Sequence, residues 1–385
     1  MNWIIARNVR VAQLAVNRDS DLAACQKYTK AFGVDVTEII AFDLDSHPDY
    51  DSSNVCPFLE DCVNVRSLSI YRSVIQKALL DTVATCSTLR EVHFINCDEE
   101  MNDESIETEV EQTLELACVE LQCNSNTATS LLHMTNPACL TRIHVCCVDG
   151  SEEILDELAT LLGEAPSLKA LSLSSCEGLD EERLTELIEL CPQVEHLDLS
   201  DIADLGSNFG GTIASLKRLK SLNITCVQDV EDYVPFLARC PALTALYCSD
   251  SGITFGGLNK ILKRRSLRTL AIGVPENNDL DLSMLGNLTS LIVDYNYAGA
   301  DLLPLIAKHC VSLQHLRLDS ETTHKSDFTS LSVSDLPLLR TLELYGEPHK
   351  YANRAQLDAL QAQRPGLGVV WTNLPGYRFC TVSAE

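Results

Sequence analysis

Stretches long enough to cross a membrane are missing from this sequence. No apolar run approaches the ~18 residues that a membrane-spanning helix needs. The first residues, MNWIIARNVRVAQLAV, are interrupted by Arg7 and Arg10 and contain no signal-peptide core or cleavage site. These absences predict a soluble intracellular protein, in the cytoplasm or the nucleus, rather than a secreted or membrane-embedded one.

Basic residues are scarce compared with acidic ones. The chain has 29 Lys plus Arg against 55 Asp plus Glu, and its formal net charge is −26. Such a surface repels phosphate groups and anionic lipids, so we expect neither nucleic acid nor a membrane as a partner. A basic protein is the partner that this charge favours.

Catalytic and cofactor motifs are also absent. There is no Gly-rich phosphate loop and no C-x-x-C pair, and neither Cys118 with Cys123 nor Cys146 with Cys147 fits a standard zinc spacing. The sequence therefore predicts no cofactor, no metal and no enzymatic activity. One alternative is open: His144 and Cys146 should face the same side of a strand, where a Cys–His pair would make a thiol-based enzyme or small-molecule site.

What the sequence does contain is a repeat. At 385 residues and 45% hydrophobic, the chain exceeds one ordinary compact domain. A pattern with apolar residues at positions 1, 4 and 6 recurs about every 25 residues, within the range of leucine-rich repeats. Position 1 falls at Val11, Val36, Val65, Leu89, Leu116, Leu140, Leu168, Val194, Leu219, Leu243, Leu267, Leu288, Leu313, Leu339 and Leu367.

Each repeat is expected to contain one short strand and one helix. The alternation across positions 4 to 6 is typical of a half-buried strand. Leu184, Leu187, Ile188 and Cys191 then follow the spacing of an amphipathic helix. About 15 such units predict a right-handed α/β horseshoe-shaped solenoid, with a parallel sheet on the concave face and helices on the convex face.

Cysteine recurs at one place in this pattern. Five repeats have a cysteine three residues before position 1, where the helix makes its last inward turn and a small apolar side chain fits. Pro192 and Pro241 follow two of these cysteines because the helix is ending there. We therefore expect buried packing residues, and these are Cys62, Cys86, Cys191, Cys240 and Cys310.

The segments CPQVEHLDLS from Cys191 and CPALTALYCS from Cys240 carry a family resemblance. The chain resembles the cysteine-containing subtype of leucine-rich repeat proteins, as in the substrate receptors of F-box ubiquitin ligases, and more distantly ribonuclease inhibitor-like horseshoes. The resemblance covers roughly residues 10–375. It implies that Cys97 and Cys176, at position 9, bond the loop backbone. It also offers an alternative function, as the substrate-recognition subunit of a cullin-type ubiquitin ligase. Val11 already fits the repeat, so we expect an F-box-less relative.

The domain prediction is one solenoid over residues 1–385. Residues 1–35 should form an N-terminal capping repeat and residues 365–385 a C-terminal cap. Residues 98–115, DEEMNDESIETEVEQTLE, carry nine acids and no base. We expect an acidic helix or loop there, either solvated or acting as a docking arm for a Lys/Arg-rich target.

Positions 3, 5 and 7 should face the concave groove, where charged and aromatic side chains are candidate binding anchors. The predicted anchors are Phe42, Glu91, His93, Arg142, His144, His196, Asp198, Tyr247, His315, Arg317, Glu343, Tyr345 and Trp371. Acidic residues gather at the edge where strands end, here named the acidic rim: Asp98, Glu99, Asp149, Glu177, Asp201, Asp250 and Glu321.

Position 2, at the edge where strands begin, is basic in six repeats. Ligands of open parallel sheets favour the carboxyl ends of strands. We therefore predict a non-enzymatic scaffold that binds a basic protein through the concave face and the acidic rim. The alternative is that these charges only balance those of neighbouring repeats. The six basic residues are Arg66, Arg90, Lys169, Lys220, Arg268 and Arg340.

Overall fold

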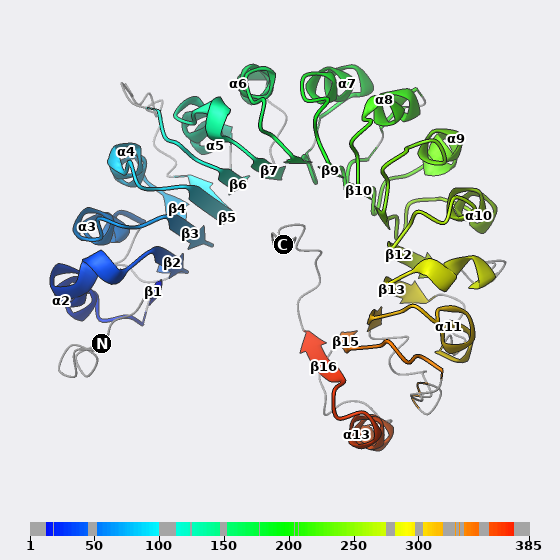
Figure 1. The fold of residues 1–385 in the computed structure, drawn as a ribbon. Coiled ribbons are helices and arrows are strands. Elements are labelled where there is room, and N and C mark those ends of the chain that lie inside the picture. Colours follow the sequence, from blue (N-terminus) through cyan, green and yellow to red (C-terminus); the bar gives the residue numbers. More distant parts are fainter. Residues whose placement is uncertain are drawn as a thin grey trace. The chain divides into compact units, whose positions relative to one another are not determined.

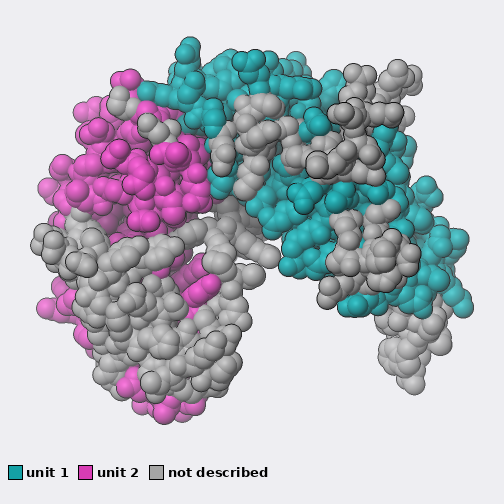
Figure 2. Space-filling model, turned by 180° about the vertical axis from the view of Figure 1, so that it is seen from behind, with its two compact units in different colours: residues 1–194 teal, residues 195–385 magenta. Residues whose placement is uncertain are grey.

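The computed structural model describes residues 13–17, 19–44, 52–99, 113–123, 125–146, 152–176, 178–203, 205–206, 208–274, 282–296, 303–318, 328, 331, 335–345 and 354–372. The chain divides into two compact units, residues 1–194 and residues 195–385, which Figure 2 distinguishes by colour. Among the described residues, no helix has both the length and the apolar character that crossing a membrane requires.

Unit 1 alternates strands with helices, and its sheet has the order β1-β2-β3-β5-β6-β7-β8, with β4 beside β5. The elements are β1 (Gln13–Asn17), α2 (Leu22–Phe32), η1 (Gly33–Asp35), β2 (Glu38–Phe42), η3 (Ser52–Val55), α3 (Cys56–Asp61), β3 (Ser67–Tyr71), β4 (Val74–Ile75), α4 (Lys77–Thr85), β5 (Glu91–Glu99), β6 (Cys118–Cys123), α5 (Ser125–His133), η4 (Pro137–Cys139), β7 (Arg142–Cys146), α6 (Glu152–Gly163), β8 (Ala170–Ser172) and α7 (Glu181–Glu189).

Unit 2 continues the same alternation, with strands β9 to β16 in sequence order. The elements are β9 (His196–Asp198), α8 (Phe209–Ser215), β10 (Ser221–Asn223), η5 (Val230–Tyr233), α9 (Val234–Leu237), β11 (Ala245–Tyr247), α10 (Phe255–Leu262), β12 (Thr269–Val274), η6 (Leu282–Asn287), β13 (Ser290–Asn296), α11 (Leu303–His309), β14 (His315–Leu318), β15 (Thr341–Tyr345), α13 (Arg354–Gln363) and β16 (Gly368–Thr372).

The strand register confirms the repeat. All described strand pairs are parallel, and up to β15 position 3 of one repeat lies opposite position 3 of the next, as Glu38 does opposite Ser67. Leu197 and Leu199, at positions 4 and 6, have no exposed surface. Within each unit the strands lie on the inner side of the curve and the helices on the outer side (Figure 1). The predicted fold class, an α/β leucine-rich-repeat solenoid, is therefore confirmed.

The strands end in a recurring left-handed turn that the sequence pattern did not reveal. Position 8 has a φ of +49° to +61° in seven repeats. Asp and Asn adopt this conformation more readily than most residues. The aspartates of the rim at this position thus have a conformational reason to be there as well as an electrostatic one. The seven residues are Asp43, Arg72, Asn96, Ser175, Asp201, Cys226 and Asp250.

In the last strand, β16, the side chains that face the groove differ from those that the repeat pattern predicts. Leu367 lies at position 1, because its amide bonds the Arg364 carbonyl as in other repeats, but the strand starts one residue early and pairs Leu344 with Trp371. Leu344 is fully buried on the helix side of the sheet. Trp371 therefore lies on the helix side, and its predicted place in the groove was wrong. Compared with the other repeats, this repeat has one residue fewer between the turn and the strand. Each side chain of β16 therefore lies on the opposite face of the sheet from the one that the repeat pattern predicts.

Four of the five cysteines before position 1 are buried, as predicted, whereas Cys86 is partly exposed. Cys191 and Cys310 have no exposed surface, and burial raises the pKa of both thiols to about 12. The Cys191 thiol donates to the Leu187 carbonyl four residues earlier in α7, at 3.3 Å. At position 9, the thiols of Cys97 and Cys176 donate to carbonyls of the preceding repeat at 3.4 and 3.5 Å. These thiols therefore serve the fold.

Only the ends of the acidic segment 98–115 lie within the described residues. Asp98 and Glu99 are the last residues of β5, and Glu115 comes shortly before β6. Residues 100–112 lie outside the described part of the chain, as do residues 373–385 of the expected C-terminal cap. The roles given to these segments, and the single domain over 1–385, stay predictions.

Candidate functional site

A network of charged side chains crosses the groove-facing side of β5, β6 and β7 in unit 1. His93, Glu120 and His144 are neighbours in register, all at position 5. The Nδ1 atom of His93 lies 2.8 Å from Glu120 Oε2, and the Nδ1 atom of His144 lies 3.5 Å from Glu120 Oε1. Glu120 therefore joins two histidines that the sequence had singled out separately. It was itself missed, although position 5 of the repeat beginning at Leu116 points to it.

Position 3 adds a second layer to this network. Glu91 Oε2 lies 3.8 Å from His93 Nε2, and Glu91 Oε1 lies 3.5 Å from Arg142 Nη2. Four predicted anchors, Glu91, His93, Arg142 and His144, are thus brought together around Glu120.

The pKa values of the central pair move apart. Burial favours a neutral His93, but hydrogen bonds to Glu120 and Glu91 and their negative charge outweigh it and raise the pKa of His93 to about 9. Burial likewise favours a protonated Glu120, but hydrogen bonds to His144 and His93 prevail and lower its pKa to about 2. At neutral pH the pair is an imidazolium beside a carboxylate.

The stabilising effect of His93 should depend on pH. Its folded-state pKa of about 9 lies above the ordinary 6.5, so its contribution is complete below pH 6.5 and is lost as the pH rises towards 9. The Glu120 contribution is present above pH 4.5 and is lost as the pH falls towards 2. The melting-temperature difference between the wild type and His93→Gln should therefore be largest between pH 4.5 and 6.5. A difference that stays constant from pH 6.5 to 9 would contradict the ion pair.

The thiol alternative at His144 and Cys146 finds little support in this geometry. The Nε2 atom of His144 lies 3.0 Å from Ser174 Oγ, and its Nδ1 atom faces Glu120. Cys146 is 7% exposed. Both ring nitrogens thus have oxygen neighbours, and a nucleophilic thiol needs a nitrogen available as its base.

Two aromatic rings stack beside this network. Phe42, a predicted anchor, and Tyr71, which was missed, both occupy position 7 on β2 and β3. Their ring centroids are 4.9 Å apart with an interplanar angle of 17°. They form an aromatic surface at the ends of these two strands.

Unit 2 has a smaller network on β13, β14 and β15. His315 Nε2 lies 3.3 Å from Glu343 Oε2, and Arg317 Nε lies 3.8 Å from Glu343 Oε1. Ser290, also missed, lies 3.0 Å from His315 Nδ1. The hydrogen bond from His315, reinforced by the Arg317 charge, lowers the pKa of Glu343. Tyr345 is at position 7 of the same strand and half-buried.

The predicted anchors on β9 and β11 are more enclosed. Asp198 is only 4% exposed, and its Oδ1 atom accepts hydrogen bonds from the Ser200 amide and hydroxyl at 3.0 and 2.8 Å. Burial and the charge of Asp198 raise the pKa of Tyr247, and burial lowers the pKa of His196. Asp198 is thus a structural carboxylate rather than an exposed anchor.

The acidic rim is best described in unit 2. Asp201 and Asp250 are exposed at position 8 on either side of Cys226, and Asp294 accepts a hydrogen bond from Ser249. Burial, followed by the charge of Asp201, raises the pKa of Cys226 to about 11, and Asp250 and Asp294 add to this. In unit 1 Asp98 is exposed. Three predicted rim residues and one side chain lie outside the described part: Asp149, Glu177, Glu321 and the side chain of Glu99.

No family model matches the chain. Among solved structures it is similar to TLR13 in a complex with ssRNA13 (13% identity, TM-score 0.45, covering 92% of this chain and 57% of that one). It is also similar to the yeast Rad7 and Elc1 complex (14% identity, TM-score 0.47, covering 90% of this chain and 77% of that one). A third similar structure is an internalin, InlF, of Listeria monocytogenes (16% identity, TM-score 0.43, covering 95% of this chain and 88% of that one). The chain thus spans little more than half the length of the TLR13 chain. These low identities concern the fold alone.

The TLR13 structure contains single-stranded RNA. For this chain, the expectation that it binds no nucleic acid rests on its net charge and remains a prediction.

Proposed function

We propose that the chain is a non-enzymatic protein-interaction scaffold that binds a basic segment of another protein through the groove face and the acidic rim. The observation that carries this proposal is the set of carboxylates around Cys226 at the strand ends of unit 2. Burial is the main cause of the raised pKa of this thiol. The negative charges of Asp201 and Asp250, in the turns after β9 and β11, and of Asp294 on β13 add to it. A Lys or Arg side chain placed there would meet several carboxylates at once.

The turn conformation alone does not account for this arrangement. The left-handed turn tolerates Arg72, Ser175 and Cys226 at position 8, so the backbone conformation does not require an acid. Asp201 and Asp250 are also exposed. Exposed carboxylates at the carboxyl ends of parallel strands are suited to contact a partner.

The rim can be tested without disturbing its turns. Asn keeps the preference for the left-handed conformation and removes the charge. We expect Asp201→Asn with Asp250→Asn to weaken binding of a labelled Lys/Arg-rich peptide by about tenfold in fluorescence anisotropy at low salt. The dependence of affinity on salt should also become shallower.

The control is the pair Glu153→Gln with Glu189→Gln. Both residues are exposed on helices α6 and α7, and the pair changes the net charge by the same amount. Equal weakening by the rim and control pairs, or no saturable binding in the wild type, would refute the rim as a binding site.

The ubiquitin-ligase alternative is favoured by one observation, the buried cysteine at the helix end of several repeats. That feature is what the cysteine-containing subtype of leucine-rich repeats shares with the F-box receptors. Co-purification of the full chain with a cullin adaptor is the expected result for this role, and its repeated absence would exclude the role.

A further inference from the structure

Two arginines lie side by side at the edge of unit 1 where the strands begin. Arg66 and Arg90 both occupy position 2, immediately before β3 and β5, and the Arg90 amide donates to the Arg66 carbonyl at 2.8 Å. Neighbouring strands are about 5 Å apart, so the two guanidinium groups start from adjacent points. Like charges in this relation repel each other unless an anion lies between them.

Only one of the two arginines has a carboxylate partner among the described residues. The Nη1 atom of Arg90 donates to the carbonyls of Ser87 and Leu89 at 2.9 and 2.6 Å, and its Nη2 atom lies 3.1 Å from Glu115. Arg66 is exposed and is paired with no described side chain. Among the described residues, the positive charge of Arg66 is therefore not compensated, and it lies next to the guanidinium of Arg90, which its hydrogen bonds hold in place.

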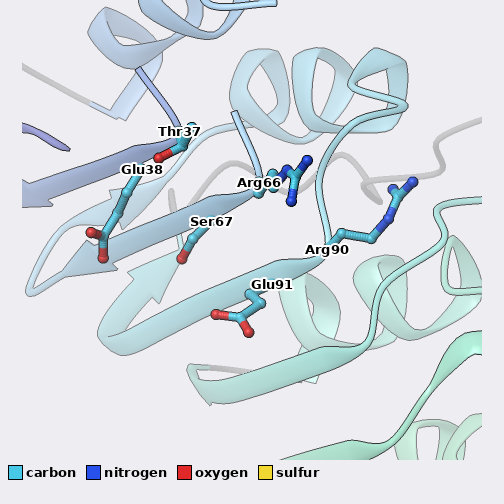
Figure 3. A pocket seen from close by; sticks show the side chains of 6 residues that line it. All are labelled: Thr37, Glu38, Arg66, Ser67, Arg90 and Glu91. Carbon is cyan, nitrogen blue, oxygen red and sulfur yellow. The ribbon is translucent and has the colours of Figure 1, made fainter. Parts of the chain in front are cut away.

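A pocket opens at this edge, and Figure 3 shows six of its lining side chains. Ser67 also lines this pocket, in register between Glu38 and Glu91, and an adjoining hollow adds Asn64 and Thr88. Asn64 and Thr88 both directly precede position 1, so the same three-residue unit, a polar residue, an apolar one and an arginine, occurs on both strands.

The two glutamates of the pocket do not neutralise the arginines. Glu38 accepts a hydrogen bond from Gln13 Nε2 at 2.8 Å, and Glu91 lies 3.5 Å from Arg142. Figure 3 shows both carboxylates pointing away from the side chains of Arg66 and Arg90. The carboxylates and the guanidinium groups thus lie on different sides of the sheet edge where β3 and β5 begin.

We propose that Arg66 and Arg90 form a binding site for a phosphorylated side chain of a partner peptide. Guanidinium groups donate paired hydrogen bonds to phosphate oxygens, and the Thr88 hydroxyl in the adjoining hollow offers a further donor. The overall charge of −26 repels anions at long range, but at physiological salt this repulsion is screened beyond ~8 Å. Whether an anion binds at this site then depends on the charges close to it, chiefly those of the two arginines. This site is independent of the acidic rim and needs no basic partner.

Isothermal titration of the full chain tests the proposal with three probes: inorganic phosphate, a phosphoserine peptide and its unphosphorylated copy. The phosphopeptide should bind saturably and tighter than either of the others. We expect Arg66→Ala to weaken it by about tenfold and Arg66→Lys, which keeps the charge but not the fork, by less. Since Arg66 is paired with no described side chain, its variants should melt at the wild-type temperature.

The matched control is Lys169→Ala. Lys169 is exposed at position 2 of the repeat containing β8, with the uncharged Thr141 as its neighbour on the preceding repeat. If Lys169→Ala and Arg66→Ala weaken phosphopeptide binding equally, the loss of affinity reflects only the change in net charge. That result would overturn the proposed binding site. Equal affinity for the phosphorylated and unphosphorylated peptides would overturn it as well. Inorganic phosphate binding as tightly as the phosphopeptide would overturn the peptide assignment.

Discussion

Glu120→Ala should lower the free energy of unfolding by about 2–3 kcal/mol, somewhat less than the ~3–5 expected for breaking a fully buried pair. The side chains of His93 and Glu120 are 16% and 18% exposed, so water screens them only in part. Without Glu120, the only carboxylate left near His93 among the described residues is that of Glu91, at 3.8 Å, and His144 loses the carboxylate beside its Nδ1 atom. The loss should appear as faster hydrogen exchange of the amides of β5, β6 and β7.

Glu38→Ala is the matched control for this prediction. Glu38 also faces the groove from a strand of unit 1, but its side chain makes a single hydrogen bond to the described residues, from Gln13 near the surface. Its removal should cost below about 1 kcal/mol. A double-mutant cycle between Glu120→Ala and His93→Ala should give a coupling of about 1–2 kcal/mol at pH 6. A coupling near zero, or equal losses for the two glutamates, would show that the network contributes nothing beyond packing.

Glu120 also shows how far sequence reasoning reaches in this fold. The repeat template places His93, Glu120 and His144 at position 5 of three successive repeats, and parallel pairing that stays in register from Glu91 to Ile95 makes them neighbours. This network was therefore predictable once residues about 25 apart were compared position by position. Each repeat considered alone shows only one of these three side chains.

Other features depended on information that the template lacks. The phase of Trp371 changed because one residue is missing between the last turn and β16, and a periodic pattern contains no signal for such a deletion. Asp198 is buried, and its carboxylate is satisfied there by hydrogen bonds from Ser200, which lies in the turn after β9. The left-handed position 8 is occupied by five residue types in seven repeats, so composition alone did not identify it.

Arg364 occupies the place that cysteine takes in other repeats, three residues before position 1. It is 7% exposed, and its guanidinium donates to the carbonyls of Leu331, Leu336 and Leu339 at 3.3, 2.7 and 3.0 Å. Burial lowers its pKa, but an arginine remains charged well above neutral pH. These carbonyls belong to the segment before β15, so the side chain holds the last repeat to the one before it.

Arg364→Ala should therefore detach the last repeat. Buried carbonyls that lose a charged donor cost about 1–3 kcal/mol each, so we expect a local loss of about 3 kcal/mol or more. Because solenoid repeats contact only their neighbours, this loss should appear as faster hydrogen exchange in α13, β15 and β16 with little change in unit 1.

Arg264→Ala provides the comparison, because Arg264 has the same position in its own repeat. It donates to the carbonyls of Ala238 and Cys240 at 2.8 and 3.1 Å, but it is exposed, so water can replace it. We expect a cost of about 1 kcal/mol there. Arg364→Lys keeps the charge but lacks the planar guanidinium needed to reach three carbonyls. Hydrogen exchange of the last repeat in this variant should therefore be faster than in the wild type and slower than in Arg364→Ala. If Arg364→Ala leaves exchange in β16 unchanged, the guanidinium does not hold the last repeat in place.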